Sequence, residues 1–98
     1  MLYASIRVQR SLRDFGEAAR RINVGLVPIL QKIPGFRGYY AVECEGGVGV
    51  SFCVFEDEKG AQHSNERAAT WGKENLADIS DGGPPEMLAG RVLVFADR

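Results

Sequence analysis

Apolar and polar residues alternate at the start of the chain, and this pattern predicts a strand over residues 2–9. One face of the strand holds Leu2, Ala4, Ile6 and Val8, and the other holds Tyr3, Ser5, Arg7 and Gln9. A repeat of two residues is typical of a strand that is buried on one face. We therefore expect the apolar face to pack beneath the helices of the fold.

A helical repeat follows this strand. Between Leu12 and Ile33 apolar residues recur at steps of three and four, as on the buried side of a helix. Ser11 is the expected N-cap, with Asp14 three residues later as in a capping box. Pro28 lies inside the repeat, so a kink or break is expected near residues 24–28.

Two apolar runs, 36–44 and 48–56, flank the three-residue sequence Glu-Gly-Gly at 45–47, which predicts a hairpin. A three-residue loop places Cys44 opposite Val48. One face of the hairpin then holds Gly38, Tyr40, Val42, Val50, Phe52 and Val54. The other face holds Arg37, Tyr39, Ala41, Glu43, Gly49, Ser51, Cys53 and Phe55. A two-residue loop would mix these faces, so it is disfavoured. We expect the first, more apolar face to lie under the helices.

A second helix is predicted over 57–79, a breaker cluster at 81–85 and a last strand over 90–98. The order strand, helix, strand, strand, helix, strand is that of the α+β ferredoxin-like fold, βαββαβ. Its four-stranded antiparallel sheet has the expected order 4-1-3-2. The whole chain, 1–98, is expected to form a single domain.

Composition narrows the function classes. The chain has 98 residues, 45% hydrophobic and 26% charged, with a net charge of -1, as in an ordinary globular domain. This charge offers no general attraction to nucleic acid or to an anionic membrane. The opening residues resemble neither a signal peptide nor a spanning segment, and the two cysteines, Cys44 and Cys53, fit a reducing compartment. The sequence therefore predicts a cytoplasmic protein without nucleic-acid or membrane partners.

The sheet face away from the helices is expected to be too aromatic to stay in water, which predicts a homodimer through that face. A cavity shared by two copies would hold a small molecule. The expected binding residues are Tyr3, Ser5, Arg7, Arg37, Tyr39, Ser51, Cys53, Phe55, Trp71 and Arg91.

Three stretches carry a family resemblance: VPILQKIPGFRGYYAVE, SFCVFEDEKGAQHSNERAATWGKENL and GRVLVFAD. They are similar to the small antibiotic biosynthesis monooxygenase-like proteins of the dimeric α/β-barrel superfamily. The resemblance implies a barrel formed by two sheets. It also implies oxygen-dependent chemistry on aromatic substrates without metal or flavin.

The candidate residues admit more than one interpretation. Arg7 and Arg37 suit a carboxylate, enolate or phenolate, or equally a salt bridge across the dimer, for example to Glu43. Trp71 either covers the end of the pocket or completes the core. His63, the single histidine, is expected on the surface, and the residues predict no metal site.

Three functions stay open at this point. The chain is a cofactor-independent monooxygenase-like protein that acts on a small aromatic or quinone-like, anionic molecule, a non-catalytic ligand-binding dimer, or a purely structural dimer. No nucleophile–base pair separates these functions, so the sequence leaves open whether the chain is an enzyme. A polar-lined cavity of about 300 Å³ would favour the first two.

Overall fold

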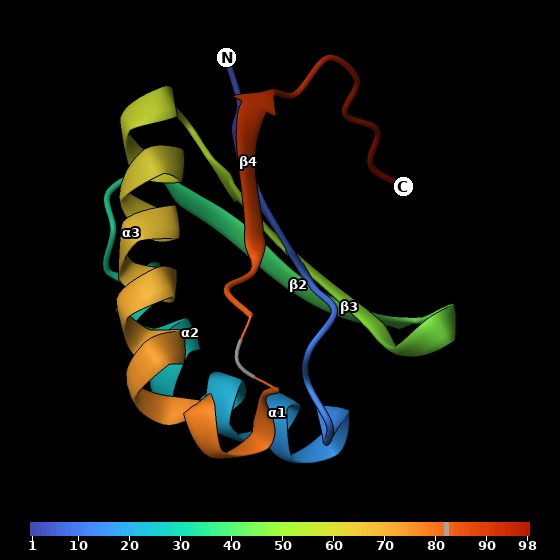
Figure 1. Cartoon of the computed structure of the whole chain (residues 1–98). Coiled ribbons are helices and arrows are strands. Elements are labelled where there is room, and N and C mark those ends of the chain that lie inside the picture. The colour runs from blue at the N-terminus through green and yellow to red at the C-terminus, as the bar shows by residue number, and fades with distance from the viewer. Residues whose placement is uncertain (82) are drawn as a thin grey trace.

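The computed structural model describes residues 1–81 and 83–98, and its central feature is an antiparallel sheet (Figure 1). The strands are β1 (Tyr3–Gln9), β2 (Phe36–Cys44), β3 (Val48–Phe55) and β4 (Glu86–Arg91), in the order β2-β3-β1-β4. All three strand pairs are antiparallel. The predicted α+β ferredoxin-like fold and strand order are confirmed. Gly82, part of the predicted breaker cluster, lies outside the described residues.

Helices cover one side of this sheet, with α3 on the left and α1 at the bottom in Figure 1. They are α1 (Phe15–Arg21), a π-helical turn (Ile22–Leu26), α2 (Val27–Gln31), α3 (Glu58–Asn75) and a 3-10 turn (Ala77–Ile79). The predicted break before Pro28 is confirmed as the π-helical turn, in which the Val27 N–H reaches back to the Ile22 carbonyl. The predicted cap at Ser11 is wrong. Asp14 caps α1, because its side chain accepts a hydrogen bond from the Glu17 N–H.

The predicted hairpin register is confirmed along most of its length. Cys44 lies opposite Val48 and Tyr40 opposite Phe52, and the loop Glu45–Gly47 has three residues. Gly46 and Gly47 adopt φ values of 74° and 75°, which favour glycine. The register shifts near the start of β2, where Phe36, not Arg37, faces Phe55.

The last strand differs from its prediction over residues 90–98. It runs from Glu86 to Arg91, paired with β1 from Val8 to Tyr3. Beyond Arg91 only the Val92 N–H bonds to this neighbour, at the Leu2 carbonyl, because β1 begins there. The segment 92–98 continues away from the sheet (Figure 1), with Leu93, Val94 and Phe95 at least 66% exposed.

The predicted orientation of the sheet is inverted. Ser5, Cys53 and Phe55 are 0% exposed on the helix-covered face, whereas Tyr40 on the opposite face is 58% exposed. Helix α3 buries small residues against the sheet, among them Ser64. The Ser64 Oγ atom lies 2.7 Å from the Ser5 Oγ atom. A buried hydroxyl needs a polar partner, and the polar face of β1 supplies it.

The hydrophobic core is concentrated at one end of this interface. It consists of Leu26, Leu30, Ile33, Cys53, Phe55, Ala61 and Ala68. Phe55 packs edge-on against Phe36, with ring centroids 5.7 Å apart. No helix in the described part of the chain is long and apolar enough to cross a membrane.

Candidate ligand pocket

A pocket of about 310 Å³ lies between the sheet and the helices, next to the core. Its floor is formed by β1, β2 and β3, and its walls by α1, the π-helical turn and α3. Polar groups on the floor include Arg7, Tyr39 and Ser51. Apolar side chains on the walls include Leu12, Phe15, Ile22, Leu26, Trp71 and Leu76. The pocket therefore combines an apolar wall with a polar floor, as ligand sites commonly do.

Arg7 is the positively charged group of the floor, which also includes Glu43, and the arginine is only 6% exposed. Its guanidinium donates to Asn65 Oδ1 at 2.9 Å, to Ser51 Oγ at 3.2 Å and to Ser5 Oγ at 3.4 Å. It also donates to Cys53 Sγ at 3.2 Å. All four acceptors are neutral side chains, and no carboxylate within the described residues forms an ion pair with Arg7. The guanidinium is thus oriented while its charge is not neutralised.

Tyr39 lies beside this guanidinium. The Arg7 Cζ atom is 6.0 Å from the centroid of the Tyr39 ring, within cation–π range. Burial raises the pKa of the Tyr39 phenol above its usual value of 10.0, against the opposing effects of Ser51 and Arg7. Tyr39 is therefore a neutral hydrogen-bond donor at physiological pH.

Phe15 brings the start of α1 close to the strand β3. A Cβ atom placed on Gly49 would lie 2.6 Å from Phe15 Cε1, closer than carbon atoms can approach. The ring therefore rests directly on the backbone of β3. This contact favours glycine at position 49 and places Phe15 at one wall of the pocket.

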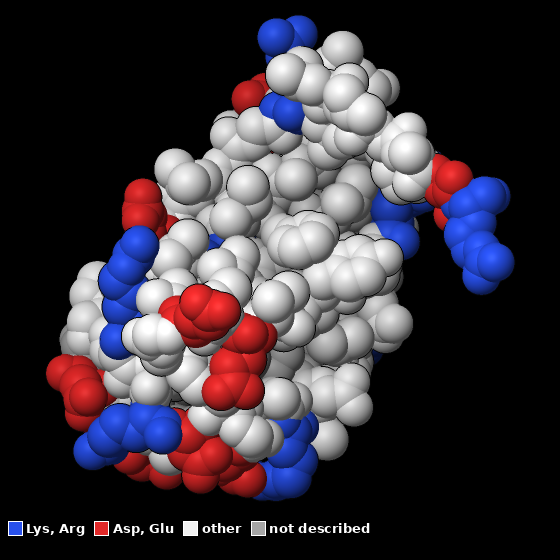
Figure 2. Space-filling view, turned by 90° about the vertical axis from the view of Figure 1, so that its right-hand side faces the viewer, with Lys and Arg blue, Asp and Glu red and all other residues white. Residues whose placement is uncertain are grey.

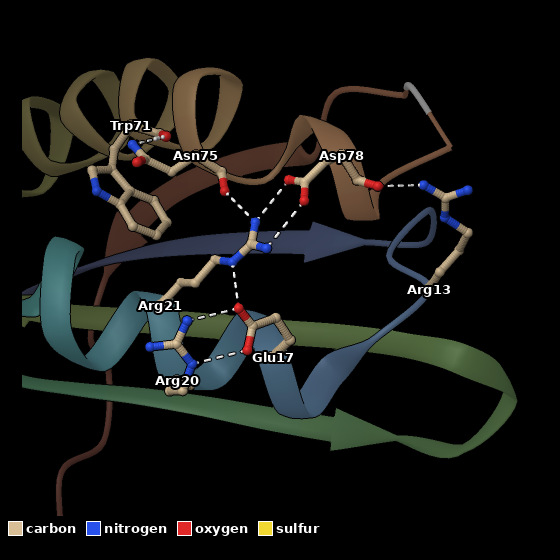
Figure 3. A network of polar contacts seen from close by, with 7 residues as sticks. All are labelled: Arg13, Glu17, Arg20, Arg21, Trp71, Asn75 and Asp78. Carbon is tan, nitrogen blue, oxygen red and sulfur yellow. Dashed lines mark hydrogen bonds and ion pairs between the residues drawn. The ribbon is translucent and has the colours of Figure 1, made fainter.

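A network of ion pairs holds α1 to the segment after α3 (Figure 3). Arg21 donates to both carboxylate oxygens of Asp78 and to the Asn75 carbonyl at 2.8 Å. It also donates to Glu17 at 2.7 Å, and Arg20 binds the same carboxylate. Arg21 thereby joins α1 to the end of α3 and to the 3-10 turn Ala77–Ile79.

The arginines alter the acidity of both carboxyl groups. Hydrogen bonds from Arg20 and Arg21 lower the pKa of Glu17 to about 2. A hydrogen bond from Arg21 lowers the pKa of Asp78 below its usual 3.8. Both groups are therefore ionised throughout the physiological range.

The ten predicted site residues are only partly brought together. Arg7, Tyr39, Ser51 and Trp71 line the pocket, and Ser5 and Cys53 contact Arg7. They lie beneath the helices, not in the expected dimer cavity. Binding by these residues stays a prediction.

The remaining predicted residues lie elsewhere. Phe55 belongs to the core, and Tyr3 packs against it. Arg37 projects from the irregular start of β2 and pairs with Glu56 at 3.4 Å. Arg91 ends β4 and is exposed. Neither arginine is part of the pocket lining.

The ten predicted site residues include neither Asn65 nor the wall residues Phe15 and Ile22. Asn65 orients Arg7 and also donates to the Leu88 carbonyl at 3.1 Å. Its position on the buried side of α3, next to Ser64, was a usable signal, because polar residues there need partners on the facing strand. The wall residues Phe15 and Ile22 carry the same helical repeat as core residues, so the pattern could not separate them.

The candidate metal-binding and nucleophilic residues are dispersed. His63 is exposed, as predicted, and Cys44 and Cys53 are free thiols. Within residues 1–81 and 83–98 no three His, Cys, Asp or Glu side chains gather in a possible metal site.

The face of the sheet away from the helices is largely uncharged in its upper middle part, with acidic groups below this part and charged groups at the margins (Figure 2). Its apolar residues include Tyr40, Val42 and Leu88, which are 58%, 46% and 50% exposed. Tyr40 stacks on Phe52 across the hairpin, with ring centroids 5.1 Å apart. We call this surface, formed by Ile6, Val8, Tyr40, Val42, Val50, Phe52, Val54 and Leu88, the open sheet face.

Comparison with solved structures identifies the fold. A provisionally assigned antibiotic biosynthesis monooxygenase from Nitrosomonas europaea matches with a TM-score of 0.70 at 18% identity, over 94% of this chain and 90% of that one. The chain has the antibiotic biosynthesis monooxygenase fold. No family model matches the sequence, and no curated protein does.

Two other structures with this fold are named for an oxygenase activity. The monooxygenase ActVA-Orf6 of Streptomyces coelicolor, in complex with nanaomycin D, has a TM-score of 0.65 at 14% identity, covering 98% of this chain and 92% of that one. SnoaB, a cofactor-independent oxygenase from Streptomyces nogalater, has a TM-score of 0.71 at 9% identity, covering 99% and 98%. At these identities the likeness establishes the fold alone.

Proposed function

We propose that this chain is a cofactor-independent monooxygenase-like protein that binds a small aromatic or quinone-like anion in the pocket beneath its helices. One observation carries the proposal: Arg7 is buried in the pocket floor, and its hydrogen-bond partners in the described part of the chain are all neutral. A buried cation without a counter-ion is costly. A bound carboxylate, phenolate or enolate would supply the missing charge.

The walls suit the aromatic part of such a ligand. Phe15, Ile22, Trp71 and Leu76 face a space of about 310 Å³, which is near the lower end of ordinary ligand sites. A flat molecule of two or three rings fits this volume. Its anionic oxygen would lie on the floor, between Arg7 and Tyr39.

The same floor suits a reaction with oxygen. A phenolate or enolate held by Arg7 and Tyr39 is electron-rich and can reduce O₂ directly. When a phenol becomes a quinone, one oxygen atom enters the ring and the other leaves as water with two hydrogens of the substrate. Stabilisation of the anion by preorganised donors is the contribution expected of the protein. The names of ActVA-Orf6 and SnoaB support this reaction class.

We further propose a homodimer through the open sheet face. Tyr40, Val42 and Leu88 expose apolar area together, and a patch of this kind commonly marks an interface. The exposed tail residues Leu93, Val94 and Phe95 would add to the buried area. In such a dimer the two sheets would form a barrel, and each chain would keep its own pocket.

A second candidate, a non-catalytic binding protein, uses the same pocket. One observation favours it: the single histidine, His63, is exposed and lies outside the pocket lining. The site therefore lacks the commonest general base. A purely structural dimer is less well supported, since the pocket has the size and polar lining expected of a ligand site.

Ligand screening followed by oxygen measurements tests these candidates. Phenols, hydroquinones and aromatic carboxylates are screened for thermal stabilisation, and each hit is then followed with an oxygen electrode and product analysis. Oxygen uptake that is lost in Arg7→Met and kept in Arg37→Met supports the monooxygenase. Stabilisation without oxygen uptake supports the binding protein. A hit that stabilises wild type and Arg7→Met equally would overturn the assigned site.

A further inference from the structure

Gly25 lies in the π-helical turn Ile22–Leu26, directly behind the indole of Trp71. A Cβ atom placed on Gly25 would lie 2.9 Å from Trp71 Cζ2, 3.0 Å from Nε1 and 3.2 Å from Cε2. A real methyl group cannot occupy that position unless the indole moves. The rigid ring offers no flexible end that could absorb the conflict.

The positions of Gly25 and Trp71 relative to the pocket show how their contact would affect a ligand. Trp71, Ile22 and Leu26 line the pocket, whereas Gly25 does not. The indole therefore stands between Gly25 and the pocket. Displacing it from the turn moves its atoms toward the space that a ligand would occupy.

The choice of residue at position 25 supports the same conclusion. Glycine is a poorer helix former than alanine, and Gly25 has no positive φ that would require it. Of the constraints that favour glycine, the close approach of Trp71 is the one present here. The local π-turn is itself a feature found frequently at functional sites.

We propose that Gly25 is a specificity-determining residue, which sets the width of the pocket by letting Trp71 lie flat against the π-helical turn. This inference rests on the proposed function, because width matters only if the pocket holds a ligand. Ligands of increasing aromatic size should therefore respond differently to a methyl group at position 25. The effect acts through Trp71, so it should depend on the presence of the indole.

Three aromatic carboxylates of increasing size, benzoate, naphthoate and anthracene carboxylate, serve as probes in titration calorimetry. We expect Gly25→Ala to bind the two larger probes at least about tenfold more weakly and benzoate within about twofold, since one methylene in an apolar pocket has effects of this scale. The double variant Gly25→Ala/Trp71→Leu should regain affinity for the two larger probes. Equal weakening of all three probes, or no recovery in the double variant, would overturn the proposal.

A measurement without ligand separates this inference from the proposed function. Trp71 is the only tryptophan of the chain, so fluorescence and acrylamide quenching report its surroundings alone. Gly25→Ala should change both, whereas Gly90→Ala in β4, outside the pocket lining and with nothing within 4 Å of an added Cβ, is the control. If wild type binds none of the probes, the proposed function fails for this ligand class and with it the role in specificity. An unchanged spectrum in folded Gly25→Ala contradicts the contact itself.

Discussion

The Arg21 guanidinium donates to both carboxylate oxygens of Asp78, over 2.7 and 3.0 Å, although the two residues are 57 positions apart. Glu17, one turn before Arg21, accepts from the same guanidinium. The two carboxylates hold α1 against the end of α3 through one arginine (Figure 3). Their contribution to stability should therefore depend on acidity.

Glu17→Gln should lower the melting temperature at pH 7, and the difference from wild type should shrink in acid. The folded-state pKa of about 2 lies below the ordinary 4.5, so the stabilisation is complete above the unfolded-state pKa. It is lost as the pH falls from about 4.5 toward about 2. Thermal melts from pH 7 to pH 2 measure this, with Glu66→Gln on the exposed side of α3 as control. A difference independent of pH would contradict the assigned ion pairs.

Arg7→Met should weaken binding of an aromatic carboxylate by about 1.5 to 3 kcal/mol, the scale of a hydrogen bond to a charged group. The same change should alter the melting temperature little, because removal of a buried unpaired charge offsets the loss of the hydrogen bonds to Asn65 and Ser51. Calorimetric titration and thermal melts of one preparation give both quantities. A large loss of stability with unaltered binding would assign Arg7 a purely structural role.

A substitution at Tyr40 tests the proposed homodimer. Tyr40 is exposed on the open sheet face, so Tyr40→Glu should produce a folded monomer if that face forms the dimer. Sedimentation at tens of micromolar is suitable, since an interface of about 1,600 Å² normally persists there. Val24→Glu replaces another apolar residue, 69% exposed on the π-helical turn, and should leave the assembly unchanged. Identical sedimentation of wild type and Tyr40→Glu would argue against this interface.

Gly49→Ala should destabilise the fold by about 1 to 3 kcal/mol, the usual cost of overpacking. The added methyl group would lie 2.6 Å from Phe15 Cε1, so the Phe15 ring or α1 must shift. Gly90→Ala in β4 is the control, because a Cβ there meets nothing within 4 Å. Urea unfolding of both variants gives the comparison, and equal stabilities would show that Phe15 moves freely.

The hairpin illustrates what local sequence can determine. The Glu45–Gly47 loop and the alternation around it define which residues face one another, and the register from Gly38 to Cys44 agrees with the structure. Which face meets the helices is a different question, because both faces of the hairpin carry large apolar residues. Phe52 and Phe55 lie on opposite sides, so burial patterning alone could not choose between them.

Which face of the sheet meets the helices is determined by residue pairs that are distant in sequence. Ser64 on α3 requires a polar neighbour and finds Ser5, and Asn65 binds Arg7. These pairs join residues 59 and 58 positions apart, beyond the reach of any periodic pattern. The sequence therefore predicts a site on the sheet face away from the helices, whereas the pocket described above lies beneath the helices.

The uneven filling of the layer between sheet and helices has a consequence for the lifetimes of its hydrogen bonds. Around Leu30 and Phe55 the layer is solid, while beneath α1 it encloses the pocket. Segments with fewer buried contacts open at lower free energy than the global unfolding of a domain. Amide hydrogens of α1 should therefore exchange with solvent much sooner than those of α2. A molecule could then enter and leave beneath α1 while the sheet and the solid end of the layer stay intact.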